Sequence, residues 1–114
     1  MSPITTHVLD TARGTPARGM AVAVEAPDGA HRWAEIARGV TGADGRIIDF
    51  DPPLGVLKPG VLRLRFATGD YFTGTRTPTF YPEVLVVVHI ADPGEHYHIP
   101  LLLSPFGYST YRGA

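Results

Sequence analysis

Histidines near both ends of the chain are the residues best suited to chemistry. His96 and His98 stand two residues apart near the C-terminus, and His7 lies close to the N-terminus. An imidazole has an unperturbed pKa of about 6.5, so in a half-dry pocket it can accept or release a proton near neutral pH. These residues predict general acid–base chemistry, provided that the fold brings them to one place.

Side chains on a β-strand alternate between two faces, and this alternation sorts the residues around the histidines. His98 falls on one face with Pro100 and Leu102, whereas near the N-terminus Val8 suits the core and leaves His7 on the outer side. The opposite face of the C-terminal run is uniformly large and apolar, and we expect it to face the core: Tyr97, Ile99, Leu101 and Leu103. An outer face with apolar residues usually meets a partner surface, which favours a subunit interface beside His98.

Three interpretations of these histidines stay open from the residues alone. They are solvated surface side chains, members of an acid–base site, or metal ligands, because His96 and His98 project together. Zinc would need a third protein ligand, and the chain has no HxxEH element and no cysteine. Neither a GxSxG elbow nor a phosphate-binding glycine loop occurs. We therefore expect no metal, no cofactor and no serine nucleophile.

Composition restricts the remaining possibilities. The 114 residues suit a single domain, 1–114, with 44% hydrophobic and 18% charged residues. A net charge of −1 provides no attraction to nucleic acid or to anionic membranes. The longest apolar run, Val84 to Val88, is too short to cross a bilayer. With no cysteine and no visible targeting segment, a cytoplasmic location is the expectation.

Short segments with strand character must position the histidines. Thirteen glycines and eleven prolines argue against long helices, although Gly69 to Thr75 suits one or two helical turns. Leu62 to Phe66 alternates apolar residues with arginines, and Val84 to Val88 is typical of a central strand. The other expected strands are Thr6–Asp10, Met20–Ala26, His31–Val40, Ile47–Phe50 and His96–Leu103. Seven or eight strands with frequent turns predict an all-β sandwich.

Two long motifs make the chain resemble a known family. The opening "THVLDTARGTPARGM" and the closing "YHIPLLLSPFGYSTYRG" are similar to the signatures of the 5-hydroxyisourate hydrolases, the transthyretin-like enzymes of purine catabolism. The segments "TGADGRI" and "YFTGT" followed by "YPEVLVVV" extend the likeness. It runs from His7 to Gly113.

The resemblance implies a fold, an assembly and a reaction. The fold would be a transthyretin-like (prealbumin-like) β-sandwich of two four-stranded sheets, with one short helix near Gly69–Thr75. The family forms homotetramers, as dimers of dimers, with active sites in a channel where subunits meet. Its reaction is hydrolysis of 5-hydroxyisourate to 2-oxo-4-hydroxy-4-carboxy-5-ureidoimidazoline in urate degradation. No cofactor is implied.

Matching the family's motifs position by position gives the expected site. His7, Arg46 and His98 correspond to its catalytic residues, and His7 and Arg46 also to substrate-binding residues. Tyr111 and Arg112 begin the closing tetrapeptide and are expected to bind substrate. Ala114 stands where the usual pattern has serine, so that hydroxyl is missing.

The expected chemistry places a water between His7 and His98, one accepting its proton and the other orienting it or protonating the leaving nitrogen. The sequence alone does not assign these two roles between His7 and His98. Arg46 would hold substrate oxygens with its fork of donors. Each residue also has a plainer interpretation: a solvated charge for Arg46, an interface aromatic for Tyr111 and a free tail charge for Arg112. His31, His89 and His96 are expected to be structural or surface residues.

Two other functions compete with hydrolysis. One is a non-enzymatic carrier of small molecules, because transthyretin shares the fold and binds a hormone in the same channel. The other is a structural β-sandwich module of a larger assembly. A carrier channel does not need two histidines, an arginine and a closing Tyr-Arg, so these residues favour the enzyme.

Overall fold

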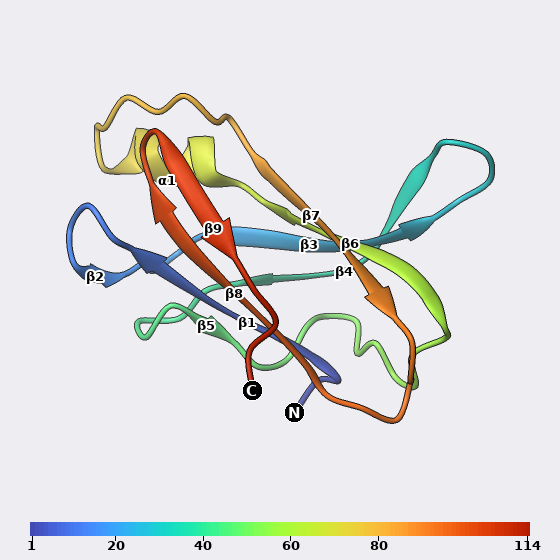
Figure 1. The fold of residues 1–114 in the computed structure, drawn as a ribbon. Helices are drawn as coiled ribbons and strands as arrows, with labels where there is room; N and C mark the ends of the chain where they lie inside the picture. The colour runs from blue at the N-terminus through green and yellow to red at the C-terminus, as the bar shows by residue number, and fades with distance from the viewer.

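Apolar residues that alternate along short strands build two facing sheets. The computed structural model describes residues 1–114 (Figure 1). Its elements are β1 (Ile4–Asp10), β2 (Thr15–Pro16), β3 (Ala21–Pro27), β4 (Trp33–Val40), β5 (Arg46–Ile47), β6 (Gly60–Phe66), α1 (Thr68–Gly74), β7 (Val84–Ile90), β8 (Tyr97–Ser104) and β9 (Gly107–Thr110). No helix has the length and apolar character that a membrane crossing requires.

The strands form two layers. One sheet has the order β2-β1-β8-β9, with the two-residue strand β5 added to β1, and the other has the order β4-β3-β6-β7. The predicted sandwich of two sheets with one short helix is confirmed, and the first sheet carries β5 as a fifth strand. The helix begins at Thr68 and ends at Gly74, so both of its ends lie one residue earlier than in the predicted segment.

The core lies between the sheets and follows the predicted alternation. On β8, Tyr97, Ile99, Leu101 and Leu103 are all buried, as is Val8 on β1. On β6, Leu62, Leu64 and Phe66 are buried while the arginines between them are only partly covered. Phe72 of α1 also enters this core. The assignment of His7 and His98 to the outer face is therefore confirmed.

The two ends of the chain are joined by a parallel strand pair. β1 and β8 lie side by side, with Thr5 opposite His98 and His7 opposite Pro100 (Figure 1). A parallel pair needs a long crossover, which the intervening chain supplies by building the whole of the other sheet. This pairing is the step that brings the histidines from the two ends of the chain onto one surface.

Two expectations about strands are wrong. Val84–Val88 is not central, because β7 is the edge strand of its sheet and pairs only with β6. Its apolar character continues onto the outward face, where Leu85 and Val87 are exposed. The strand expected at Ile47–Phe50 shortens to β5, since the chain leaves β1 after Ile47 to cross to the other sheet, where Asp51 bridges Arg38.

Candidate active site

A tight turn places Arg46 beside His7. β5 pairs with β1 so that Arg46 lies directly opposite His7. The turn before it requires Gly45, which has a φ of +79° and whose carbonyl accepts a hydrogen bond from the Val8 amide at 2.8 Å. A Cβ at Gly45 would lie 2.4 Å from the Val8 carbonyl oxygen, so only glycine lets the turn approach β1 this closely.

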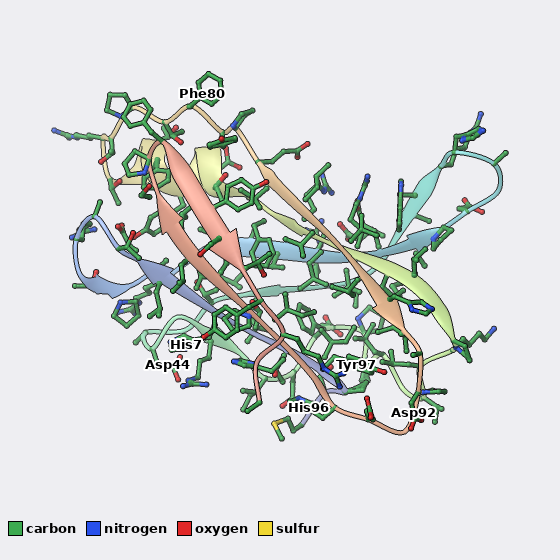
Figure 2. All side chains as sticks on the ribbon, viewed as in Figure 1. His7, Asp44, Phe80, Asp92, His96 and Tyr97 are labelled. Atoms are coloured by element: carbon green, nitrogen blue, oxygen red, sulfur yellow. The ribbon has the colours of Figure 1, made fainter.

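The proton on His7 has a defined position. Its Nε2 lies 2.9 Å from the carbonyl oxygen of Asp44, and the two residues are neighbours in Figure 2. A carbonyl oxygen only accepts hydrogen bonds, so Nε2 carries the hydrogen and Nδ1 of the neutral ring keeps its lone pair. His7 therefore offers an acceptor nitrogen from β1.

Arg46 keeps its donors available. Its side chain is about half exposed, and its nearest carboxylate, Asp44, is 4.0 Å away. An exposed ion pair at that distance holds a guanidinium only weakly. Arg46 can therefore present its planar set of N–H groups to an anionic or carbonyl oxygen.

His98 is held against β1 by a hydroxyl. The Oγ1 of Thr5 lies 2.8 Å from His98 Nδ1 and 3.1 Å from His96 Nε2. Thr5 is only 3% exposed, whereas His98 is half-buried and His96 is exposed. Since Thr5 occupies Nδ1, the Nε2 atom is the nitrogen of His98 that remains for a substrate or a water.

The surroundings of His98 favour its neutral form. Burial lowers the pKa of His98 below its ordinary value of 6.5, and the nearby charges of Arg46, His7 and His96 lower it further, while a backbone hydrogen bond with Thr5 acts in the opposite direction. At neutral pH the ring is therefore an uncharged proton acceptor.

A small pocket of about 170 Å³ lies on this face. Arg46 and His98 line it together with Thr5 and His96, and residues from both ends of the chain, Met1 and Ala114, close it. The N- and C-termini lie together in Figure 1. Pockets that enclose a drug-sized ligand usually measure about 300–1,000 Å³, so this pocket is smaller than that range.

The C-terminal tail is fastened to the strand that carries His98. The Gly113 amide donates to the His98 carbonyl at 2.8 Å, forming an isolated bridge. A Cβ at Gly113 would lie 2.5 Å from Cδ2 of the His98 ring. The glycine thus lets the tail pack against the imidazole edge, and a larger residue would push the ring aside.

Tyr111 and Arg112 lie elsewhere within one chain. They line a second pocket of about 300 Å³ with Tyr97, Ile99 and residues of β7. Arg112 pairs with Glu95 at 2.8 Å and lies over the Tyr97 ring at 4.5 Å. The structure therefore places His7, Arg46 and His98 on one sheet face, although only Arg46 and His98 line the small pocket, and it leaves the expected substrate-binding pair in a different pocket. The roles of all five residues stay predictions.

Two members of this site, Thr5 and His96, were not among the expected residues. The alternation rule placed His96 on the same face as His98, which was the available signal. Thr5 carried no signal, because its contact depends on the parallel register between β1 and β8. That register joins residues more than 90 positions apart, and no local pattern specifies it.

Known proteins resemble this chain over nearly its whole length. The model of the HIUase/Transthyretin family matches residues 4–113. The chain belongs to this family. The 5-hydroxyisourate hydrolase of Salmonella dublin is 43% identical over 111 residues, covering 97% of this chain and 80% of that protein.

Two solved structures share the fold over nearly the whole chain. The structure of Klebsiella pneumoniae 5-hydroxyisourate hydrolase superposes with a TM-score of 0.82 at 34% identity, covering 97% of this chain and 98% of that one. Sea bream transthyretin in complex with thyroxine superposes with a TM-score of 0.88 at 35% identity, covering 98% and 95%. The transthyretin-like fold is confirmed, and the backbone alone does not separate the enzyme from the carrier.

Proposed function

We propose that this protein hydrolyses 5-hydroxyisourate to 2-oxo-4-hydroxy-4-carboxy-5-ureidoimidazoline in urate degradation. The observation that carries the proposal is the meeting of His7, Arg46 and His98 on one sheet face. Relatives at 43% identity bear the name of this activity. Two imidazoles and a guanidinium are suited to adding water to a cyclic amide.

His98 acts as the general base. Its Nε2 takes a proton from a water whose oxygen adds to the carbonyl carbon of the ring amide. The C–N bond then breaks, and the departing nitrogen receives a proton from the imidazolium, which restores the neutral ring. His98 suits this role because its lowered pKa keeps it unprotonated at neutral pH.

His7 and Arg46 serve the same step from β1 and β5. The Nδ1 lone pair of His7 accepts a hydrogen bond from the water and orients it, since its Nε2 is already bound to Asp44. The N–H groups of Arg46 stabilise the negative charge that develops on the carbonyl oxygen. Both residues also bind the ground-state substrate.

Tyr111 and Arg112 bind substrate in the assembled protein. Within one chain they line a separate pocket. This role therefore requires contacts between subunits that bring the tail of one chain close to the substrate bound by another. Replacing Arg112 with glutamine is expected to raise KM with a smaller effect on kcat, because Arg112 lies away from the reacting atoms.

The assembly is a homotetramer built as a dimer of dimers. Support comes from apolar surface that one chain leaves uncovered. The outward side of the edge strand β7 exposes Leu85 and Val87, and Phe80 is 71% exposed and projects away from the fold in Figure 2. Unpaired edges and large apolar side chains of this kind are usually covered by partner subunits.

The remaining properties follow from the whole chain. A single cluster of 21 buried residues supports one hydrolase domain spanning residues 1–114. The near-neutral charge supports a small-molecule substrate rather than nucleic acid or a membrane as partner, and no cofactor is needed for the steps above. A chain without cysteine suits the reducing cytoplasm.

The competing function is a transthyretin-like carrier, which the likeness to the thyroxine-bound sea bream protein favours. One assay separates the two. Uricase generates 5-hydroxyisourate in the cuvette, and ultraviolet absorbance follows its decay with and without the purified protein. Decay that accelerates in proportion to protein concentration supports the hydrolase. Decay at the buffer rate, with the substrate merely bound, supports the carrier.

A further inference from the structure

The hydroxyl of Thr5 connects two imidazoles. Its oxygen lies 2.8 Å from Nδ1 of His98 and 3.1 Å from Nε2 of His96, and the structure gives this hydroxyl no other hydrogen-bond partner. His96 stands just before β8 near the lower end of the sheet in Figure 2. The three residues form a hydrogen-bonded series, from the proposed catalytic base His98 through Thr5 to the exposed ring of His96.

A hydroxyl has a single hydrogen, so Thr5 can donate to only one of the two imidazoles. Thr5 is 3% exposed, and buried donors are almost always hydrogen-bonded. Its hydrogen must therefore point to one of the two rings, and its oxygen accepts a hydrogen from the other. The tautomers of His96 and His98 are consequently linked through Thr5.

The site favours one of the two arrangements. If Thr5 donated to His98 Nδ1, then Nε2 of the neutral ring would carry a hydrogen and would present a donor to a pocket that Arg46 already lines with donors. In the opposite arrangement, His98 donates from Nδ1, and the lone pair on Nε2 faces that pocket. The positive guanidinium stabilises the second arrangement.

We propose that Thr5 and His96 are positioning residues, in which Thr5 accepts the Nδ1–H of His98 and donates to Nε2 of His96. This relay holds His98 in the tautomer whose Nε2 is free to accept a proton from water. Its kinetic consequence rests on the proposed hydrolase function, whereas the tautomer does not. His96, outside the expected catalytic set, thereby acts on His98 without touching substrate.

Protonation of His96 works against the relay. A doubly protonated ring donates from Nε2 and cannot accept from Thr5, which frees the Thr5 hydrogen to turn to His98. Other titratable or charged groups also lie in this region: His7 on β1 and Arg46 on β5, together with Met1, whose amino group is 3.6 Å from Asp49. The variants that test the relay therefore keep all of these groups.

Nuclear magnetic resonance of the histidine ring nitrogens tests the relay without an activity assay. At pH 7.5 the wild-type protein is expected to show His98 with a protonated Nδ1 and a free Nε2. Thr5→Val, which replaces the hydroxyl with a methyl, and His96→Ala, which removes the acceptor, should both shift His98 towards the Nε2–H tautomer. Thr5→Ser should retain the wild-type pattern.

Kinetics then measure the consequence. Thr5→Val and His96→Ala are expected to lower kcat about tenfold or more with little change in KM, which is part of the 10²–10⁴-fold that a general base contributes. Thr5→Ser should recover most of the rate. His96 is exposed, so His96→Ala is informative even if Thr5→Val does not fold.

Two results would overturn the relay: a wild-type His98 that carries its hydrogen on Nε2, or a tautomer that both variants leave unchanged. A wild-type protein with the expected tautomer and no hydrolysis would refute the proposed function and leave the relay standing. The two failures are thus distinguishable.

Discussion

His98 combines three features that a base needs at neutral pH. It is half-buried, it lies near the positive charge of Arg46, and its Nδ1 is bound by Thr5. Burial and positive neighbours both disfavour the imidazolium, so the pKa of His98 falls below 6.5 and the ring stays neutral into mildly acid solution. Activity that depends on the neutral ring should therefore persist below the pH at which a free histidine protonates.

Replacing Arg46 with glutamine should raise the pKa of His98. The substitution removes a positive charge that disfavours protonation, so the acid limb of the activity profile should move to higher pH. A histidine titration by nuclear magnetic resonance gives the pKa directly, and Arg38→Gln, on the other sheet, is the matched control. An acid limb and a His98 pKa unchanged in Arg46→Gln would refute the influence of this charge.

Alternation along strands predicted the outward direction of His7 and His98, because the side-chain period of a strand is fixed at two residues. It could not predict that Thr5 lies between His98 and His96. Nor could it place Arg112, whose contacts with Glu95 and Tyr97 depend on how the tail leaves β9. Contacts of this kind depend on register and tail path, which are set by tertiary packing.

The tail that follows β9 packs against the His98 ring and is bonded to the His98 backbone. Gly113→Ala would place a Cβ 2.5 Å from Cδ2 of His98, so the ring or the tail must move. We expect kcat/KM to fall about tenfold or more, since a misplacement of about 1 Å can cost 10²-fold. Steady-state kinetics on 5-hydroxyisourate measure the effect.

Gly107→Ala is the matched glycine control for this substitution. Its Cβ would lie 3.7 Å from the nearest side-chain atom, Ser104 Oγ, which is an ordinary contact. Its kcat/KM should stay within about twofold of wild type, as expected for a substitution without a steric conflict. Equal activity of the two variants would contradict the role assigned to Gly113.

The helix α1 is tied to the end of β1 by a partly buried hydrogen bond. Tyr71 donates to Asp10 Oδ2 at 2.7 Å, and Asp10 is 1% exposed. Burial and this hydrogen bond raise the pKa of Tyr71 to about 12. Tyr71→Phe should lower the free energy of unfolding by about 1–3 kcal/mol, because a buried carboxylate oxygen loses its donor.

Urea denaturation at pH 7.5 measures this loss, with Tyr108→Phe as the control. Tyr108 is partly exposed, and its hydroxyl makes no hydrogen bond within the chain, so that variant should stay within about 0.5 kcal/mol of wild type. If Tyr71→Phe were as stable as Tyr108→Phe, the Asp10 contact would contribute nothing to the attachment of α1.

Most elements were predictable because glycine and proline mark the turns and because apolar residues alternate between them. β7 was misjudged for a physical reason. An apolar run without polar alternation is typical of a strand covered on both faces, yet one chain leaves Leu85 and Val87 uncovered. The pattern in the sequence fits the surroundings that β7 would have in an assembly.

Assembly through the β7 edge has a direct test. The wild-type protein should have a mass in solution four times that of the 12.3 kDa chain, as measured by light scattering. Val87 is 57% exposed on this edge strand, and Val87→Lys should give smaller species, because a lysine on an edge strand opposes strand pairing.

Val56→Lys places the same charge in the loop between β5 and β6, at a residue that is 89% exposed, and should leave the mass unchanged. If the site is completed between subunits, hydrolysis should fall together with the mass in Val87→Lys alone. A monomeric wild-type protein with full activity would contradict the tetramer and the interfacial site.

The proposed role of His98 is that of the general base for hydrolysis in the assembled protein. Its most direct test is the initial rate of 5-hydroxyisourate decay with wild type, His98→Ala and His31→Asn. His31 is exposed in a loop with a φ of +64°, which asparagine tolerates, so His31→Asn removes an imidazole from outside the site. The catalysed rate should fall about 10²- to 10⁴-fold in His98→Ala and stay near wild type in His31→Asn. Equal rates in all three proteins would contradict the claim.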